Sequence, residues 1–186
     1  MKFEFPLQKG QWIKRYKRFM VDLTLPDGSE LTVHSANTGS MKNCYVEGGD
    51  AWYWDSKNEK RKYPHSLELT QTPSGHVACI NTSRPNYLAV EAIENSTVKE
   101  LQDYTELKTE VRYGDEKSRI DILLSGGKKD IYVEVKNTTL LEKTVDEEPD
   151  ENGSTNEGIG YFPDSVSDRA SKHLRELMRM VELGHR

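Results

Sequence analysis

The sequence contains only two cysteines, Cys44 and Cys79, and neither belongs to a Cys-x-x-Cys pair or to a Cys/His ligand spacing. This excludes a disulfide framework and a zinc-finger fold as the source of stability. No apolar run approaches the length of a membrane span, and the residues after Met1 lack the sustained apolar stretch of an export signal. We therefore expect a soluble cytoplasmic chain whose 186 residues fold around an ordinary hydrophobic core.

A net positive charge, the usual mark of a nucleic-acid-binding protein, is also missing, because the formal charge is -5 at pH 7. The charge is unevenly distributed. Residues 1–85 contain 12 Lys and Arg against 9 Asp and Glu, a net +3, whereas residues 86–186 contain 14 against 22, a net -8. Part of that acidity falls in residues 142–157, which we interpret as a solvated insertion that either shields a site or has no function. The charge balance thus leaves a nucleic-acid-binding first half open.

The first half has the pattern of short β-strands and contains no long amphipathic helix. Apolar and polar residues alternate from Phe19 to Leu25, and a Pro-Asp-Gly turn leads into a second run at residues 31–33. Further apolar runs occur at residues 51–54, 67–70 and 77–80. About five short strands within some 80 residues suit a small closed barrel. The sequence therefore predicts an OB-like all-β barrel domain over residues 1–85.

The pattern changes at residue 86, where we place the start of a second domain that extends to residue 186. Apolar residues recur at helical spacing after Pro85, a favoured residue at the start of a helix. Three apolar runs of strand length follow, at residues 107–113, 120–124 and 131–135. A last helix is predicted to have Asp164 as its N-cap and an apolar stripe made of Val166, Ala170, Leu174, Leu177, Met178 and Val181. The sequence thus predicts a two-domain α+β chain whose second domain mixes helices and strands.

A group of charged residues lies on the predicted hairpin of the second domain. Because apolar residues occupy alternate positions of the two strands, Asp121 points away from the core face, and so do Glu134 and Lys136. If residues 126–129 form a four-residue turn, Asp121 and Glu134 lie directly opposite, with Cβ atoms about 5 Å apart. Two facing carboxylates repel each other, and a divalent cation such as Mg²⁺ or Mn²⁺ removes that repulsion. Lys136, about 7 Å from Glu134 along the strand, is near enough to orient an attacking water or to offset charge on a phosphate.

An ordinary surface hairpin is the competing interpretation, in which Lys136 and Arg119 only neutralise two exposed acids. A third acid favours the metal site. Glu91 lies on the margin of its helix's apolar stripe, about 60° from Leu88, so its carboxylate is able to point toward the sheet, whereas Glu94 points to solvent. The candidate metal ligands are therefore Asp121, Glu134 and Glu91, and Lys136 completes the set of candidate catalytic residues.

Longer motifs carry a resemblance to known proteins. The segments Ser118-Arg119-Ile120-Asp121 and Tyr132-Val133-Glu134-Val135-Lys136-Asn137 resemble the Asp and Glu-x-Lys motifs of the PD-(D/E)XK nuclease superfamily. Nearly the whole chain resembles the bacterial sugar fermentation stimulation protein A family, through Lys14-Arg15-Tyr16-Lys17-Arg18-Phe19, Asn37-Thr38-Gly39-Ser40-Met41, Lys60-Arg61-Lys62-Tyr63-Pro64, Glu110-Val111-Arg112-Tyr113-Gly114, Tyr161-Phe162-Pro163-Asp164 and Lys172-His173-Leu174-Arg175-Glu176-Leu177. The nuclease motif is short enough to recur by accident, whereas these blocks are long enough to be specific.

The resemblance implies an OB-like barrel joined to a restriction-nuclease-like domain, non-specific DNA binding, and a role in regulating sugar metabolism, particularly that of maltose. It implies no known reaction. The superfamily's two strand acids, helix acid and lysine correspond to Asp121, Glu134, Glu91 and Lys136. This sequence departs from the family at Ser171, where its helix has Gln, and at Arg186, where the family continues into a further strand. We therefore expect a contact to be missing at the first position and the sheet to lack its last strand.

Basic residues are interspersed with aromatic residues in two segments of the first domain, residues 14–19 and 60–63, a mixture that binds phosphates while stacking bases. Lysines that protect ordinary barrel edges are the alternative, and the family resemblance favours binding. Basic residues of the last helix either face a phosphate backbone or merely suit the carboxyl half of a helix. The candidate nucleic-acid-binding residues are Lys14, Arg15, Tyr16, Lys17, Arg18, Lys60, Arg61, Lys62, Lys172 and Arg175.

Three functional hypotheses remain open. They are a Mg²⁺-dependent DNA endonuclease, a DNA-binding regulator that keeps a nuclease-like fold without cleavage, and an RNA-processing nuclease. The five histidines show no metal-ligand spacing, and His173 is interpreted as a packed residue rather than a catalytic one. No membrane partner is expected.

Overall fold

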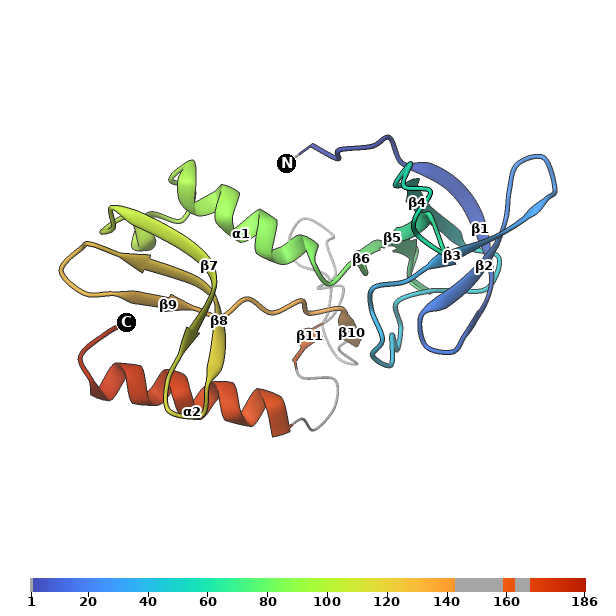
Figure 1. The fold of residues 1–186 in the computed structure, drawn as a ribbon. Coiled ribbons are helices and arrows are strands. Elements are labelled where there is room, and N and C mark those ends of the chain that lie inside the picture. Colours follow the sequence, from blue (N-terminus) through green and yellow to red (C-terminus); the bar gives the residue numbers. More distant parts are fainter. Residues whose placement is uncertain (1, 143–158, 163–167) are drawn as a thin grey trace, which may run out of the picture. The chain divides into compact units, whose positions relative to one another are not determined.

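A computed structural model describes residues 2–142, 159–162 and 168–186 (Figure 1). The chain divides into two compact units. One comprises residues 2–82 with 138–164 and is called the barrel unit, and the other comprises residues 83–137 with 165–186 and is called the sheet unit. Among the described residues, no helix combines the length and the apolar character needed to cross a membrane.

The barrel itself is built from six strands, one more than the five short runs recognised in the sequence. They are β1 (Gln8–Tyr16), β2 (Met20–Thr24), β3 (Glu30–His34), β4 (Asp50–Asp55), β5 (His65–Gln71) and β6 (Val77–Cys79). The strand order is β3-β2-β1-β4-β5-β6, and a parallel pairing of β3 with β5, at His34 and Ser66, closes the first five into a barrel. Its core contains fully buried side chains from four of these strands, among them Val21, Val33, Ala51 and Leu67. The predicted OB-type fold is confirmed.

Strand β1 was not predicted from the sequence, although it is central to the barrel and pairs with both β2 and β4. Its residues do not alternate cleanly between apolar and polar, because Gly10 occupies a buried position beside Trp12. A Cβ atom at Gly10 would lie 3.1 Å from the carbonyl oxygen of Thr24 and 3.2 Å from Cβ of Leu23. Glycine therefore allows β1 and β2 to approach closely. Because Gly10 has no apolar side chain, it also interrupts the apolar alternation by which β1 would have been predicted.

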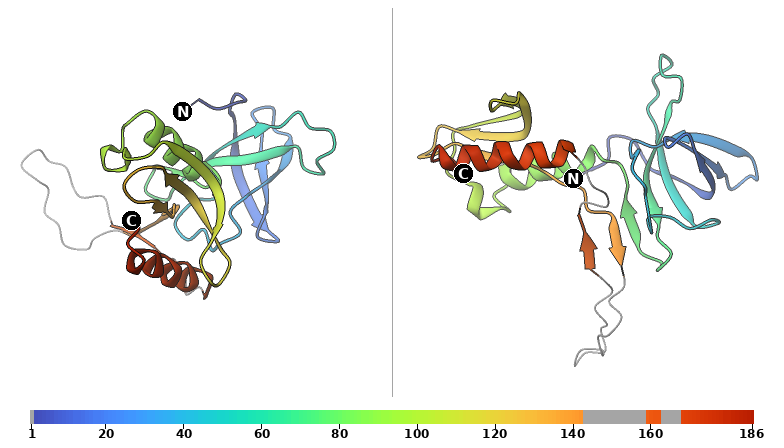
Figure 2. Two further views of the ribbon diagram at one scale, coloured as in Figure 1. Left: turned by 60° about the vertical axis from the view of Figure 1, so that its left-hand side comes forward. Right: turned by 90° about the horizontal axis from the view of Figure 1, so that it is seen from below.

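The sheet unit follows the predicted order of helix, three strands and helix. Its elements are α1 (Arg84–Glu94), a short 3-10 helix η1 (Lys99–Leu101), β7 (Glu106–Tyr113), β8 (Ser118–Ser125), β9 (Ile131–Val133) and α2 (Asp168–Glu182). The three strands form an antiparallel sheet in the order β7-β8-β9. Ile93 of α1 packs in one cluster with Ile122 and Leu124, whereas Met180 and Leu177 of α2 pack in another that includes Leu123. Because Ile122 and Leu123 point to opposite faces of β8, the sheet lies between the two helices (Figure 2).

A two-stranded arm, formed by β10 (Leu140–Glu142) and β11 (Ile159–Tyr161), belongs to the barrel unit. Lys42 Nζ lies 2.6 Å from Glu142 Oε1, and the Cys44 thiol donates to the carbonyl oxygen of Thr139 at 3.6 Å. Sequence reasoning assigned this part of the chain to the second domain. The remainder of the predicted acidic loop lies outside the described residues.

The predicted apolar stripe of the last helix is a packing face only in part. Leu177 packs against the core cluster of Tyr113, Ile120 and Met180, but Leu174, Met178 and Val181 are each more than 60% exposed, whereas Glu176 is buried. The packed face carries polar side chains because they have partners on the sheet, which a count of apolar spacing does not register. The predicted N-cap Asp164 and the stripe residue Val166 lie outside the described residues.

Gly114, in the turn between β7 and β8, makes the burial of Glu176 possible. Its φ is +69°, and a Cβ atom there would lie 1.6 Å from Glu176 Oε2. We expect Gly114→Ala to destabilise the sheet unit by about 3 kcal/mol, since it adds displacement of a buried carboxylate to the cost of a left-handed alanine. Gly184→Ala is the matched control, because Gly184 has a φ of +93° and nothing within 4 Å of its missing Cβ. Equal losses in urea unfolding for the two variants would contradict the steric argument.

Candidate functional site

The hairpin register predicted from the sequence is confirmed. Ile122 pairs with Val133 and Leu124 with Ile131, so Asp121 and Glu134 occupy the next opposed positions. Strand β9 ends at Val133, one residue before Glu134. The backbone N–H of Val135 donates to Asp121 Oδ2 at 2.7 Å. The Asp121 carboxylate therefore takes the place of the backbone acceptor on β8 that the Val135 N–H would have had if β9 had continued.

The neighbourhood of Asp121 is irregular on the β7 side as well. The β7–β8 ladder pairs Thr109 with Ile122 and Val111 with Ile120 but omits the intervening pair of Glu110 with Asp121. Glu110 has a φ of 56°, a left-handed conformation that is strained for a glutamate in a strand. Such strain is typical of functional sites, where surrounding structure holds it in place.

Asp121 is fixed from a second direction by α1. Asn86 Nδ2 donates to Asp121 Oδ1 at 3.0 Å, so both oxygens of the carboxylate accept hydrogen bonds. Sequence reasoning used Asn86 only to mark the boundary of the second half and missed this role. The sequence did contain one indication of this role. Asn86 lies in the first turn of a helix that has a proline near its start, and side chains in that turn are able to reach the end of a neighbouring strand.

Glu134 is the most constrained member of the group. Its side chain is only 8% exposed, and its Oε1 accepts from Lys136 Nζ and from His173 Nδ1, the latter at 2.6 Å. Its other oxygen, Oε2, is buried and has no hydrogen-bond partner among the described residues. A buried carboxylate oxygen without a donor is costly and is the kind of ligand that a hard cation binds.

The ordinary-hairpin interpretation accounts for only part of these contacts. Arg119 NH1 lies 3.6 Å from Glu110 Oε2 on the solvent side, so it neutralises neither predicted acid through a direct ion pair. Lys136 does pair with Glu134, but that carboxylate is buried rather than exposed. The site is therefore more enclosed than a charged surface hairpin.

Tyr113 lies near enough to the acids of this site to be affected by their charge, and it was also missed. Its side chain is buried and its hydroxyl has no hydrogen-bond partner among the described residues. Burial raises the pKa of Tyr113 to about 12, and the negative charges of Glu134, Glu176 and Asp121 contribute to the same shift. The hydroxyl thus stays protonated near neutral pH in a setting of concentrated negative charge, which attracts cations.

Glu91, the predicted third acid, is exposed on α1. Across residues 2–142, 159–162 and 168–186, no three carboxylate, imidazole or thiol groups are arranged so as to hold a metal ion. The structure therefore brings together Asp121, Glu134 and Lys136 but adds no third ligand to them. The ligand role of Glu91 stays a prediction.

Helix α2 is attached to the β7–β8 turn by three side chains that all bind Glu116. Lys172 Nζ donates to the carbonyl oxygen of Glu116, Arg175 binds the Glu116 carboxylate at 3.1 and 2.9 Å, and Glu176 accepts from the Glu116 backbone N–H. The Arg175 hydrogen bond lowers the pKa of Glu116. Lys172 and Arg175 thus have intramolecular partners, and their predicted contact with nucleic acid stays a prediction. These contacts fix the position of His173 beside Glu134.

In the barrel unit, Arg15 has a structural role. Its guanidinium donates to the carbonyl oxygens of Arg18, Asn37, Gly39 and Ser40 at distances from 2.5 to 3.3 Å. This side chain therefore holds two loops together and has few donors left for phosphate. The prediction of nucleic-acid binding by this segment therefore depends more on the basic neighbours of Arg15 than on Arg15 itself.

The turn after β1 presents two of those neighbours. Lys17 and Arg18 are exposed and have φ angles of 50° and 65°. Left-handed turn positions favour glycine or asparagine, so two long basic side chains here are kept at a cost in backbone energy. Within the described residues no carboxylate forms an ion pair with either of them.

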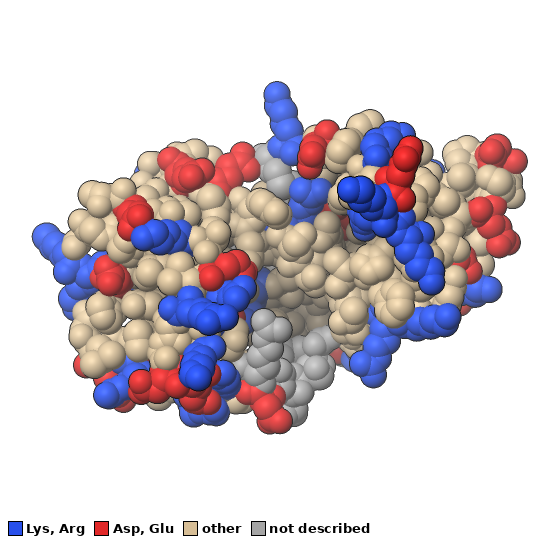
Figure 3. All heavy atoms as spheres, viewed as in Figure 1, with Lys and Arg blue, Asp and Glu red and all other residues tan. Residues whose placement is uncertain are grey.

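The two basic segments converge where the barrel closes. The ring of Phe19 lies 5.8 Å from that of His34, His34 pairs with Ser66, and Arg61 donates to Ser66 Oγ at 2.9 Å. The Arg61 guanidinium also lies 5.8 Å from the ring of Trp54. Burial and the charge of Arg61 lower the pKa of His34. On the face seen in Figure 3, Lys and Arg side chains project along the lower edge of the barrel unit.

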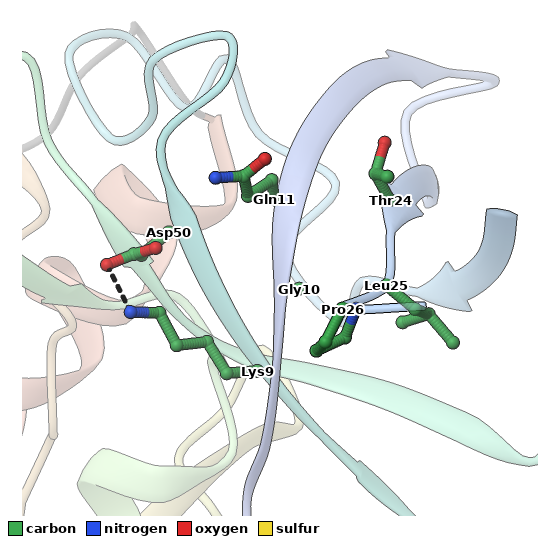
Figure 4. A pocket seen from close by; sticks show the side chains of 7 residues that line it. All are labelled: Lys9, Gly10, Gln11, Thr24, Leu25, Pro26 and Asp50. Carbon is green, nitrogen blue, oxygen red and sulfur yellow. Dashed lines mark ion pairs between the residues drawn. The ribbon is translucent and has the colours of Figure 1, made fainter. Parts of the chain in front are cut away.

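A separate open hollow on the barrel does not have the character of a phosphate site. It is lined by Lys9, Gly10, Gln11, Thr24, Leu25, Pro26 and Asp50 (Figure 4). Its cation, Lys9, is neutralised by Asp50 at 2.7 Å. The hollow therefore offers no free charge for an anion.

Comparison with known proteins agrees with this architecture. The family model described as the SfsA N-terminal OB domain matches residues 13–80, and the sugar fermentation stimulation protein RE domain matches residues 83–186. A sugar fermentation stimulation protein homolog from Saccharophagus degradans is 53% identical over 186 residues, covering 100% of this chain and 74% of that protein. A homolog from Aeromonas salmonicida is 50% identical and covers 100% of this chain and 72% of its own length.

A solved structure has the same fold. It is that of Pyrococcus furiosus SfsA in complex with Ca²⁺, which is 24% identical and superimposes with a TM-score of 0.72 over 100% of this chain and 71% of its own. Two family models together match most of the chain, and relatives with about half of their residues identical span all of it. The chain belongs to the sugar fermentation stimulation protein (SfsA) family.

Proposed function

We propose that this chain binds nucleic acid, without sequence specificity, through its barrel unit and cleaves phosphodiester bonds at Asp121, Glu134 and Lys136 with a divalent cation. The observation that carries the proposal is the Glu134 carboxylate. One of its oxygens is held by Lys136 and His173, and the other is buried without a donor among the described residues. That arrangement suits a positively charged ion, which binds a carboxylate oxygen without donating a hydrogen bond.

The donor set fits a hard cation. Asp121 and Glu134 would hold it, with Glu91 as the third proposed ligand, and Mg²⁺ or Mn²⁺ is the proposed cofactor because carboxylate oxygens are their preferred ligands. A bound ion would supply positive charge that stabilises the phosphate under attack. The Ca²⁺ complex of the Pyrococcus furiosus relative supports a divalent site in this chain.

The side chains of this chain supply the remaining chemistry. Lys136 carries a positive charge within reach of Glu134, so it is able to turn toward a phosphate oxygen and offset the charge that builds there. Asp121, fixed by Asn86 and the Val135 backbone, loses little rotational freedom when it binds a ligand. Preorganisation of this kind is what lowers the barrier for phosphoryl transfer.

The barrel unit supports the binding half of the proposal. Lys17 and Arg18 are exposed, and the adjacent Phe19 is connected to Arg61 through the contacts of His34 and Ser66, so the two basic segments are linked where the barrel closes. Lysines bind the phosphate backbone while aromatic rings stack on bases, and neither contact requires a particular sequence. DNA is the proposed partner, and single-stranded RNA fits the same chemistry.

The deciding experiment uses the purified chain with duplex, single-stranded and branched DNA and with RNA. We expect cleavage of at least one DNA substrate in Mg²⁺ or Mn²⁺, no cleavage with EDTA, and binding under both conditions. Binding without cleavage of any substrate, in either metal, would reject the enzymatic part. Cleavage of RNA but of no DNA substrate would indicate an RNA-processing nuclease instead.

A DNA-binding regulator without cleavage is the second candidate. It is favoured by the exposed position of Glu91 and by the absence of a three-group metal set among the described residues. In that case the acids would be structural, and the protein would act on sugar metabolism, to which the relatives' name refers, by occupying DNA.

A further inference from the structure

We infer that His173 is a positioning residue that holds Glu134 in its metal-binding orientation. This inference rests on the proposed function. His173 was expected to be a packed side chain, and nothing in the nuclease motif itself, which ends at Lys136, points to it. Its imidazole Nδ1 lies 2.6 Å from Glu134 Oε1, and its side chain is only 12% exposed.

The direction of this hydrogen bond follows from the chemistry of its partners. A carboxylate oxygen that already accepts from Lys136 has only lone pairs to offer, so His173 Nδ1 must carry the proton and donate. The bond occupies Oε1 and fixes the plane of the carboxylate. Oε2 is thereby held in the buried position where it has no protein donor among the described residues.

The surroundings of His173 are built to hold it. Lys172 and Arg175 both bind Glu116, and the buried Glu176 accepts the Glu116 backbone N–H. These contacts flank His173 on α2 and attach that stretch of helix to the β7–β8 turn. The imidazole is therefore delivered to Glu134 by a fixed helix rather than by a flexible loop.

The presence of two donors on one oxygen has a consequence for Lys136. If Lys136 were the sole partner of Glu134 Oε1, its movement toward a phosphate would free the carboxylate to rotate. Because His173 keeps its own bond to that oxygen, Lys136 is able to leave without disturbing the ligand. His173 thus holds the Glu134 carboxylate in place, which leaves Lys136 free to act on the phosphate.

Calorimetric titration with Ca²⁺ alone, on the whole chain and without substrate, tests this role. Removal of a group that orients a metal ligand typically costs 10- to 100-fold in metal affinity. We expect His173→Ala to weaken Ca²⁺ binding by about that factor and His173→Asn to stay within about threefold of wild type, because Asn Nδ2 replaces the Nδ1 donor. His185→Ala is the matched control, since His185 lies 3.9 Å from Asp130, which is not a proposed ligand.

The outcomes separate the two proposals. If wild type binds Ca²⁺, Glu134→Gln does not, and His173→Ala binds as wild type, the positioning role is overturned and the metal site stands. Equal loss of stability in the two His173 variants with unchanged Ca²⁺ affinity likewise overturns the positioning role alone. A folded wild type that binds no Ca²⁺, Mg²⁺ or Mn²⁺ overturns both.

Discussion

Glu134→Gln is expected to abolish divalent-cation binding and to lower cleavage by about a thousandfold, whereas Lys136→Ala is expected to lose cleavage and keep the cation. The amide keeps an oxygen that is able to coordinate a cation but loses the negative charge, which lowers cation affinity below the measurable range and removes charge stabilisation of several kcal/mol. Lys136 is not a ligand but competes with the ion for the Glu134 carboxylate. Its removal should leave cation affinity equal or higher while cleavage falls about 100-fold or more.

Both quantities are measurable on the same samples, by calorimetry for the cation and by single-turnover cleavage of the preferred substrate for the rate. Glu94→Gln is the matched control, because Glu94 is an exposed acid on α1 and not a proposed ligand. Loss of cation binding in Lys136→Ala, with the fold intact, would contradict the assignment of separate roles. Undiminished cleavage in Glu134→Gln would remove the site altogether.

Combined replacement of Lys17, Lys60 and Lys62 by alanine should weaken DNA binding about 100-fold or more at low salt. Each lysine on a phosphate releases bound counterions, so the plot of log affinity against log salt should become less steep by about one for each, or about three in total. All three side chains are exposed, and none forms an ion pair with a described carboxylate. Fluorescence anisotropy over a range of salt concentrations measures both effects.

Lys9→Ala combined with Lys57→Ala is the control for this experiment. Both lysines belong to the barrel unit, but Asp50 and Asp55 neutralise them at 2.7 and 2.8 Å. Their loss should change the salt slope little. Equal effects of the two sets would mean that DNA responds to the charge of the barrel as a whole rather than to a defined surface.

The sheet of the second unit was predictable because its strands obey simple parity. Alternating isoleucines and leucines fixed which residues face the core, and the glycine turn fixed the register that places Asp121 opposite Glu134. An alternating pattern of this kind predicts the folded strand well, because burial of one face fixes the orientation of every side chain in the strand. The helix after Pro85 was predictable for a similar reason, as proline marks helix starts.

Contacts over long sequence separations were not predictable from one sequence. His173 reaches Glu134 across 39 residues, and Glu176 reaches Glu116 across 60. Both lie on α2, whose predicted apolar stripe packs at Leu177 but is exposed at Leu174, Met178 and Val181. The hydrophobic pattern cannot signal a helix face that is held by hydrogen bonds and ion pairs, and only the fold reveals which polar groups have partners.

The bond from the Val135 backbone to Asp121 gives that aspartate a structural task besides its proposed role as a metal ligand. Because Asp121 accepts this N–H, strand β9 ends at Val133 and the Glu134–Lys136 segment leaves the sheet there. A relative without the proposed cleavage would still need an aspartate at this position to direct the backbone after β9. Under the proposed function, retention of the glutamate and lysine among members of this family is therefore a better sign of cleavage than retention of the aspartate.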